Sequence, residues 1–186
     1  MDSTDYVVTA SMADRVVRRP SGFPMADPFP PGSFFHGIDS PAHQTIPDPS
    51  FGIFSTAYDM TVFGQMILNR GRYGDARILS PAAVAAMSRD QIPGVKARFF
   101  DRLVTHGSWG YGFFVESPSK WPYFHGSLQP LGTLGHPGAG GAMFWIDPAH
   151  ELTGAYFEVT ARLTERLEPH WIFDLFQNVI TAAVDD

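Results

Sequence analysis

Residues 134–146 read Leu-Gly-His-Pro-Gly-Ala-Gly-Gly-Ala-Met-Phe-Trp-Ile, and this stretch decides how the rest of the chain is interpreted. Small residues and one imidazole fill its first half, whereas residues 142–146 form an apolar, aromatic run that is typical of a strand. A second such run covers residues 152–157, and the intervening residues 147–151 contain an Asp-Pro pair that favours a turn. We therefore predict a β-hairpin here, preceded by a short strand that leads into the glycine-rich connection.

Helical patterns lie on either side of the hairpin. Apolar residues recur on one face of residues 56–69, and Thr56 offers a capping hydroxyl, so we predict a helix of about four turns. Ser80 stands before a proline and predicts the start of a second, shorter helix over residues 82–87. Residues 172–183 keep the i, i+3, i+4 spacing of apolar residues and predict an amphipathic C-terminal helix.

Two other stretches have distinct compositions. Residues 109–115 mix aromatic and β-branched residues with glycines, which predicts a strand that another backbone approaches closely. Eight of the sixteen prolines fall between residues 20 and 49, too many for a helix or a central strand to persist. We expect a long irregular excursion there, either an ordered surface wrap or a lid.

The order of these elements predicts the fold class. Two helices, a run of antiparallel strands and a final helix describe an α+β fold, in which helices flank an antiparallel sheet. The length of 186 residues suits one domain or part of one. We expect residues 1–50 to form a Pro-rich irregular segment, and residues 51–186 to hold the helices, the strands and the C-terminal helix.

The charge balance narrows the possible partners. Thirteen basic residues against nineteen acidic ones give a formal net charge of −6, and no basic run extends beyond Arg18 and Arg19. Neither nucleic acid nor an anionic lipid surface is therefore an expected partner. No apolar run of about 18 residues predicts a membrane span. The seven histidines form no i, i+4 pair and no His-x-His, and cysteine is absent, so we expect no metal site and no cofactor.

The glycine-rich connection is the densest candidate site. Glycine has no Cβ, so residues 135–141 would let a ligand lie against bare backbone. Amides near Ala139 would then be placed to face a developing oxyanion, as acyl-transfer chemistry requires. The alternative is a glycine-rich turn beside a surface histidine, His136, and spacing alone favours that alternative.

Several short blocks follow one another in a fixed order along the chain. They are Phe-Gly-Ile-Phe-Ser-Thr-Ala-Tyr-Asp (51–59), Phe-Gly-Gln-Met (63–66), Asn-Arg-Gly (69–71), Ile-Leu-Ser-Pro (78–81), Trp-Gly-Tyr-Gly (109–112), Gly-His-Pro-Gly-Ala-Gly-Gly (135–141) and Asp-Pro (147–148). Together they resemble the C-terminal portion of the β-lactamase-related serine hydrolases, which include class C β-lactamases, D,D-peptidases and esterases. The resemblance implies an incomplete β-lactamase/transpeptidase-like fold.

The resemblance also implies a mechanism and site residues. In this family a serine, activated by a lysine one turn later and by a tyrosine from a Tyr-x-Asn loop, attacks an ester or amide substrate. His136 and Ala139 would be catalytic, with Ala139 supplying an oxyanion-hole amide, and Pro137, Gly138 and Gly140 would contact the substrate. Pro137 stands where penicillin-recognising members have a hydroxyl residue, which favours an esterase-like activity. His136 would orient or hydrogen-bond the substrate or the tyrosine base.

Two aromatic residues are further candidates for substrate contact. Trp121 and Tyr123 lie in a Pro-containing loop, where an aromatic ring is less expected to be core than on a strand.

The nucleophile and its bases are missing from the sequence. None of the six tyrosines begins a Tyr-x-Asn motif, and the one Ser-x-x-Lys, at residues 117–120, contains Pro118 and precedes His136. A serine and a lysine one turn apart need a helix, so we interpret this match as a loop. We expect the chain alone to be inactive; the alternative to a partial hydrolase is a non-catalytic binding or assembly module.

The expected partners are a small-molecule ester or amide and a missing part of the fold. An N-terminal segment of the same fold would cover part of the C-terminal helix, so the apolar face of Ile172, Phe176 and Ile180 would lose cover without it. We therefore expect either such a segment or self-association.

Overall fold

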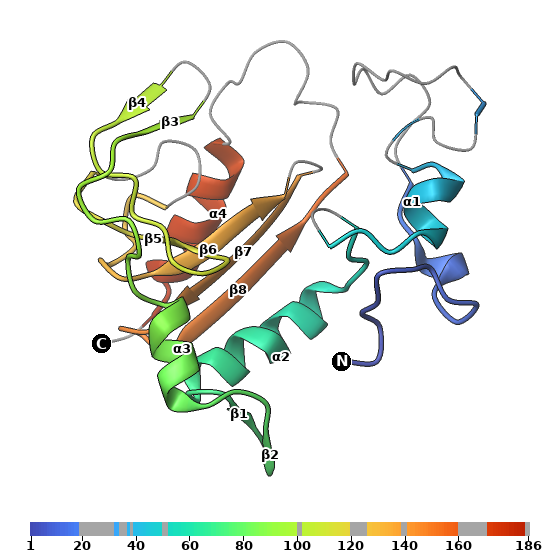
Figure 1. Ribbon diagram of the computed structural model, residues 1–186, viewed down its shortest axis with the longest axis horizontal. Helices are drawn as coiled ribbons and strands as arrows, with labels where there is room; N and C mark the ends of the chain where they lie inside the picture. The colour runs from blue at the N-terminus through green and yellow to red at the C-terminus, as the bar shows by residue number, and fades with distance from the viewer. Residues whose placement is uncertain are drawn as a thin grey trace.

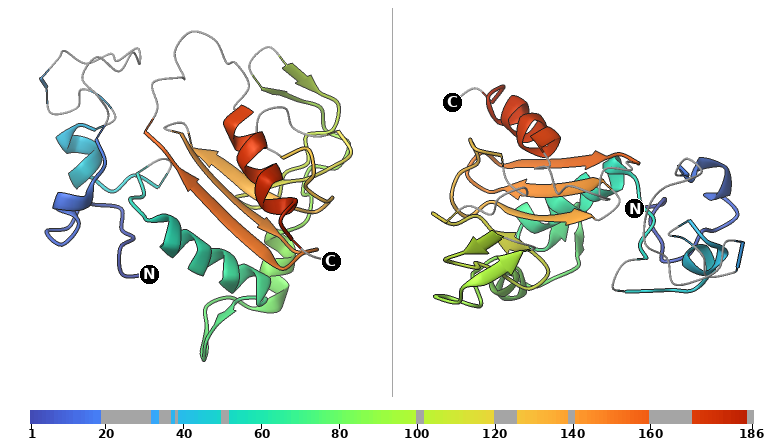
Figure 2. Two further views of the ribbon diagram at one scale, coloured as in Figure 1. Left: turned by 180° about the vertical axis from the view of Figure 1, so that it is seen from behind. Right: turned by 90° about the horizontal axis from the view of Figure 1, so that it is seen from above.

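The computed structural model describes residues 1–18, 32–33, 37, 39–49, 52–99, 102–119, 126–138, 141–159 and 171–184. Its centre is a four-stranded sheet with helices on both faces (Figures 1 and 2). The helical elements are η1 (Ala13–Arg15), α1 (Pro41–Thr45), α2 (Ala57–Leu68), α3 (Pro81–Met87) and α4 (Trp171–Thr181). The strands are β1 (Arg72–Tyr73), β2 (Ala76–Arg77), β3 (Ala97–Phe99), β4 (Arg102–Val104), β5 (Phe114–Val115), β6 (Leu134–Gly138), β7 (Ala142–Asp147) and β8 (Leu152–Phe157).

The main sheet has the strand order β5-β6-β7-β8, and every neighbouring pair is antiparallel. The β7–β8 pairing runs from Ala142 opposite Phe157 to Asp147 opposite Leu152, so the predicted hairpin is confirmed. Asp147 is fully buried and shapes the turn, because its Oδ1 accepts the N–H of Ala149 at 2.9 Å. The predicted α+β class, an antiparallel sheet flanked by helices, is confirmed.

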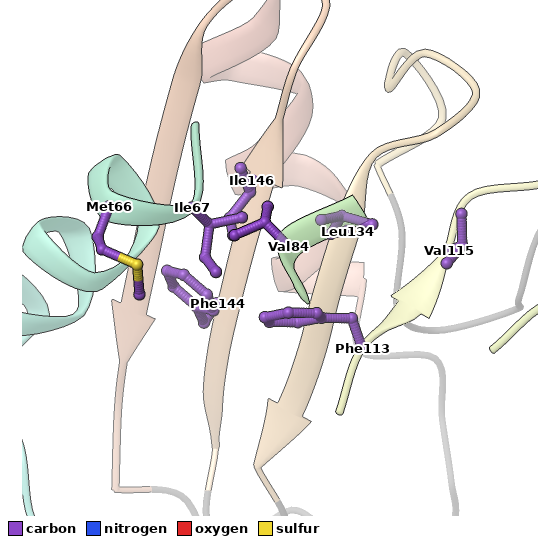
Figure 3. Packing of buried hydrophobic residues seen from close by; sticks show 8 residues of the cluster. All are labelled: Met66, Ile67, Val84, Phe113, Val115, Leu134, Phe144 and Ile146. Carbon is purple, nitrogen blue, oxygen red and sulfur yellow. The ribbon is translucent and has the colours of Figure 1, made fainter. Parts of the chain in front are cut away.

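The alternation of side chains along β7 divides the core into two layers. Phe144 and Ile146 pack with residues of α2 and α3 on one face (Figure 3). Met143 and Trp145 point to the other face, where they pack with Phe173 of α4. Both layers exclude water from apolar surface, which is the main favourable contribution to folding.

The helix starts agree with the capping residues in the sequence. The Thr56 hydroxyl accepts the N–H of Asp59 at 3.1 Å at the start of α2, and the Ser80 hydroxyl accepts the N–H of Ala83 at 3.0 Å at the start of α3. The same arrangement occurs once more, where Ser40 precedes α1 in the Pro-rich segment. Our expectation that no helix persists between residues 20 and 49 is therefore wrong for α1, because a proline suits the first turn of a helix.

The predicted strand over residues 109–115 is wrong for most of its length, because only β5 is extended. Gly112 adopts a φ of 85°, and the N–H of Gly110 donates to the carbonyl of Phe113 at 2.8 Å. The chain therefore turns back on itself, so that Trp109 forms a bridge with Phe114. The glycines that suggested a close strand pairing instead allow this turn.

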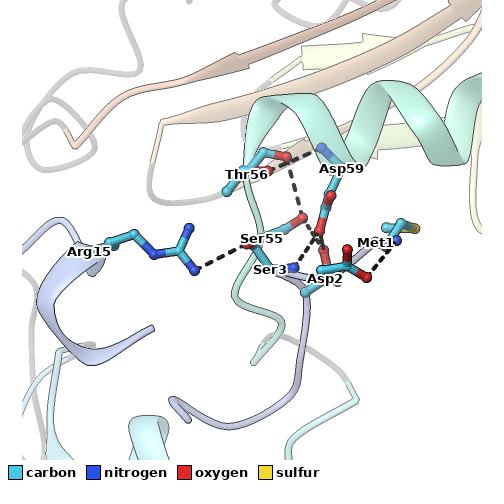
Figure 4. Close-up of polar contacts among 8 residues, drawn as sticks. Met1, Asp2, Ser3, Arg15, Ser55, Thr56 and Asp59 are labelled. Atoms are coloured by element: carbon cyan, nitrogen blue, oxygen red, sulfur yellow. Dashed lines mark hydrogen bonds and ion pairs between the residues drawn. The ribbon is translucent and has the colours of Figure 1, made fainter. Parts of the chain in front are cut away.

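The N-terminal residues bind to the start of α2 (Figure 4). The buried carboxylate of Asp59 accepts the N–H of Ser3 at 2.9 Å and the hydroxyl of Thr4 at 2.7 Å. Burial raises the pKa of Asp59, but these hydrogen bonds and the positive charges of the N-terminus and Arg15 lower it overall. Asp5 also forms a bridge with Phe54. The proposed boundary between residues 50 and 51 stays a prediction.

Two short hairpins, β1–β2 and β3–β4, lie outside the main sheet and were not predicted from the sequence. Within the described ranges, no helix combines the length and the apolar character needed to cross a membrane.

Candidate functional site

The candidate site is built on β6, whose two edges differ. On one side β7 pairs with all of β6, from Leu134 to Gly138. On the other side β5 pairs only with Leu134 and Gly135. Among the described residues no strand pairs with this second edge of β6 from His136 onward, and we call this stretch the open edge of β6.

His136 lies on the same face of the sheet as Leu134, which packs against α2 and α3. Its side chain is exposed, and its Nδ1 lies 2.7 Å from the carbonyl oxygen of Pro137. A carbonyl oxygen only accepts hydrogen bonds, so Nδ1 is the donor in this contact. In the neutral imidazole the other nitrogen, Nε2, then carries a lone pair and accepts hydrogen bonds.

Trp109 forms one wall beside His136. The two rings meet edge to face, with centroids 5.8 Å apart and an interplanar angle of 82°. The backbone of Trp109 is held on both sides, because its carbonyl accepts the N–H of Gln91 at 2.8 Å and its N–H donates to Asp90 Oδ1 at 3.2 Å. Trp109 therefore has a fixed place at the open end of β6.

Asp90 makes further contacts in the same loop. Its Oδ1 also accepts the N–H of Ile92 at 2.9 Å, and its Oδ2 lies 2.9 Å from His106 Nε2. Partial burial raises the pKa of Asp90, but the hydrogen bonds from Ile92, His106 and Trp109 lower it overall. Asp90 is thus a carboxylate that stays ionised at neutral pH.

The structure gives positions to three of the candidate site residues. His136, Pro137 and Gly138 lie together on β6, and the N–H of Gly141 donates to the carbonyl of Gly138 at 3.1 Å, which marks the turn that follows. The other four fall outside the described residues: Ala139, Gly140, Trp121 and Tyr123. The direction of the Ala139 amide, on which the oxyanion hole depends, stays a prediction.

The Ser-x-x-Lys match follows β5. Residues 117–119 form a turn and not a helix, in agreement with the interpretation as a loop, and Lys120 falls outside the described residues. Ser117 is buried, and Ser119 hydrogen-bonds to Thr105 at 3.1 Å.

Sequence reasoning missed the group formed by Asp90, His106 and Trp109. His106 and Trp109 lie 16 and 19 positions after Asp90 in the sequence. No helical or strand spacing indicates contacts over these separations. The only signal was Trp109 itself, which we interpreted as part of a strand. In the part of the chain that the structure describes, no group of three His, Asp or Glu side chains is arranged to hold a metal ion.

Curated relatives match parts of the chain. An uncharacterized protein of Mycobacterium tuberculosis is 33% identical over 131 residues, covering 65% of this chain and 32% of that protein. A putative D-alanyl-D-alanine carboxypeptidase of Salmonella gallinarum is 30% identical over 101 residues, covering 54% of this chain and 21% of that protein. The chain thus spans about a third or less of the length of these relatives.

Solved structures share the fold. A penicillin-binding protein homolog from Caulobacter crescentus superposes with a TM-score of 0.63 at 19% identity, covering 96% of this chain and 48% of that one. A beta-lactamase from Mycobacterium bovis gives a TM-score of 0.57 at 24% identity, covering 70% of this chain and 45% of that one. A model of the Beta-lactamase family matches residues 1–175, and the chain therefore belongs to the beta-lactamase family of serine hydrolases.

Proposed function

We propose that this chain supplies one wall of an acyl-transfer active site that hydrolyses a small ester or amide, with esters favoured. The observation that supports this most is the open edge of β6, where His136, Pro137 and Gly138 stand beside the fixed indole of Trp109. A bare strand edge with small residues lets a carbonyl substrate approach the backbone closely. The amide of Ala139 would complete the oxyanion hole.

The preference for esters rests on Pro137. It occupies the position where, by the family resemblance, penicillin-recognising members use a hydroxyl to hold the substrate carboxylate. Proline offers neither a hydroxyl nor a backbone N–H, so this anchor is lost. The Salmonella relative is named as a carboxypeptidase, which keeps an amide as the second substrate class.

The serine and its bases would come from the remaining part of the fold. This chain contains no Tyr-x-Asn, and its one Ser-x-x-Lys is a loop. We propose that the missing part covers the outer edge of β8, which is the last strand of the sheet among the described residues. It would also cover Leu175 and Val179 of α4, which are 51% and 59% exposed.

Ile172, Phe176 and Ile180, the face expected from the sequence to lose part of its cover, pack against the sheet layer that contains Trp145 and are partly buried. The exposed apolar pair one position away, Leu175 and Val179, adds to the surface that we propose for the contact.

Three experiments test the proposal. The chain alone, assayed with a nitrophenyl ester and a covalent serine probe, should show neither turnover nor labelling, because its sequence lacks Tyr-x-Asn and its one Ser-x-x-Lys contains a proline. The nucleotide sequence upstream of the first codon should encode Ser-x-x-Lys and Tyr-x-Asn in one reading frame with this chain. In that joined protein, His136→Ala should lower kcat/KM for the ester, while Ser117→Ala should not.

The opposite results identify the alternatives. Turnover by this chain with labelling of one of its serines would mean an unrecognised nucleophile. An unchanged kcat/KM in His136→Ala would remove His136 from the site. A joined protein that binds esters without hydrolysing them would favour the non-catalytic binding module.

A further inference from the structure

The segment between α3 and β5, which includes β3 and β4, contacts the candidate site through Trp109. Asp90 lies near the start of this segment and Trp109 near its end, and the two are joined by the hydrogen bond from the Trp109 N–H. Gln91 adds a second bond, to the Trp109 carbonyl. Both polar groups of the Trp109 backbone thus bind residues 90 and 91, which fix the place from which its side chain extends.

His106 ties the Asp90 carboxylate to the same segment. The Asp90 side chain is 21% exposed, and its two oxygens are divided between the backbone and His106 Nε2. A carboxylate that accepts several donors in a fixed geometry is held more firmly than one that accepts a single donor. The position of Trp109 is therefore set by a charged group that lies outside β6.

The indole of Trp109 limits how the imidazole of His136 can lie. The two rings meet nearly at a right angle, which is a favoured geometry for aromatic pairs, and Trp109 also contacts Phe114, with ring centroids 6.1 Å apart. In this orientation the His136 Nδ1 reaches the carbonyl of Pro137. A rotated imidazole would lose both the edge contact and this hydrogen bond.

We propose that Asp90 is a positioning residue of the candidate site. Through the backbone of Trp109 it holds His136 as the tautomer with its proton on Nδ1, so that Nε2 faces the site as a hydrogen-bond acceptor. The group that Nε2 binds is then a neutral donor, such as a hydroxyl or N–H of the substrate, and not a carboxylate. This role rests on the proposed function, but the tautomer and its dependence on Asp90 belong to the chain itself.

Long-range ¹H–¹⁵N spectra of this chain test the proposal without any catalysis. At about pH 8, His136 should show a protonated Nδ1 and an unprotonated Nε2. Its signals are assigned by their loss in His136→Gln. In Asp90→Ala and in Trp109→Leu, the single tautomer should give way to a mixture, which averages the two nitrogen shifts.

Two variants separate positioning from simple loss of stability. Asp90→Asn keeps an oxygen that accepts both backbone N–H groups, so it should keep the wild-type tautomer even if it lowers the melting temperature. Asp75→Ala removes an exposed carboxylate between β1 and β2 and should leave His136 unchanged. If Asp90→Ala does not fold, the His136 tautomer measured in Trp109→Leu and in Asp90→Asn decides whether the proposal holds.

An unchanged single tautomer in folded Asp90→Ala or in Trp109→Leu overturns the proposal. So does a wild-type chain in which the His136 proton resides on Nε2. Either result would leave the hydrolase proposal standing, because that proposal depends on ester turnover by the joined protein.

Discussion

Asp59 is one of the residues through which the N-terminal segment is attached to the start of α2. Its buried carboxylate accepts donors from Ser3 and Thr4, more than 50 positions away in the sequence. We expect Asp59→Ala to lower the free energy of unfolding by about 1–3 kcal/mol, because two partly buried donors lose their acceptor. Urea denaturation measures this change, and Asp75→Ala, at an exposed position, should stay within about 0.5 kcal/mol of the wild type.

The contribution of Asp59 should also depend on pH. Its pKa in the folded chain lies below its usual value of 3.8, so the stabilisation is fully present above that value and is lost as the pH falls below it. The difference in unfolding free energy between the wild type and Asp59→Asn should therefore shrink in acid. A difference that stays constant down to about pH 2 would mean that the ionised carboxylate contributes nothing.

The sequence predicts local features of single residues better than their distant contacts. Thr56 and Ser80 cap helices as expected, because a capping hydroxyl binds an amide only three positions away. The bonds of Asp59 to Ser3 and of Asp90 to Trp109 join residues far apart in the chain. No spacing rule identifies such pairs, and they depend on how the elements pack.

At the scale of elements, α2 lies against β8 with a glycine at the contact. A Cβ added at Gly64 would lie 2.7 Å from Cγ2 of Thr153 and 3.2 Å from Phe144 Cζ. We expect Gly64→Ala to lower the free energy of unfolding by about 1–3 kcal/mol through overpacking, although alanine favours a helix over glycine by about 1 kcal/mol. Chemical denaturation measures this change, and Gln65→Ala, at the next, exposed position, is the control.

A second substitution tests whether the contact with Thr153 causes the loss of stability in Gly64→Ala. Thr153→Ala removes the Cγ2 atom, so the double variant with Gly64→Ala should recover part of the loss. Strictly additive changes in the free energy of unfolding would mean that the loss in Gly64→Ala does not come from the contact with Thr153.

Elements with a clear local pattern were predicted, and those shaped by tertiary contacts were not. The β7–β8 hairpin follows from two apolar, aromatic runs on either side of an Asp-Pro turn, and α4 follows from helical spacing. The strand expected over residues 109–115 failed, because Gly112 turns the chain and bonds to Met87 and Asp90 hold it from outside. For the same reason, β6 was predicted as a strand, but its open edge was not.

At the scale of the whole molecule, β8 is the last strand on the side away from β5 among the described residues. An unpaired strand edge and an exposed apolar surface on the helix α4 both favour association. The solved structures have about twice the length of the part that this chain covers, so the same fold has further residues available there to cover these positions. In a pure sample of this chain, a second copy is the available partner.

We therefore predict that the isolated chain self-associates through β8 and the exposed face of α4. Sedimentation at increasing concentration should give a mass above the 20.5 kDa of the monomer. Leu175→Glu together with Val179→Lys should reduce the association, because both positions are exposed on α4 and the charges would have to be buried in the contact. Ile78→Glu changes an apolar residue of equal exposure that lies outside the main sheet, next to the β1–β2 hairpin, and should leave the association unchanged. A sharply melting monomer at all concentrations would contradict the prediction, and it would show that the described half of the fold is stable without further cover.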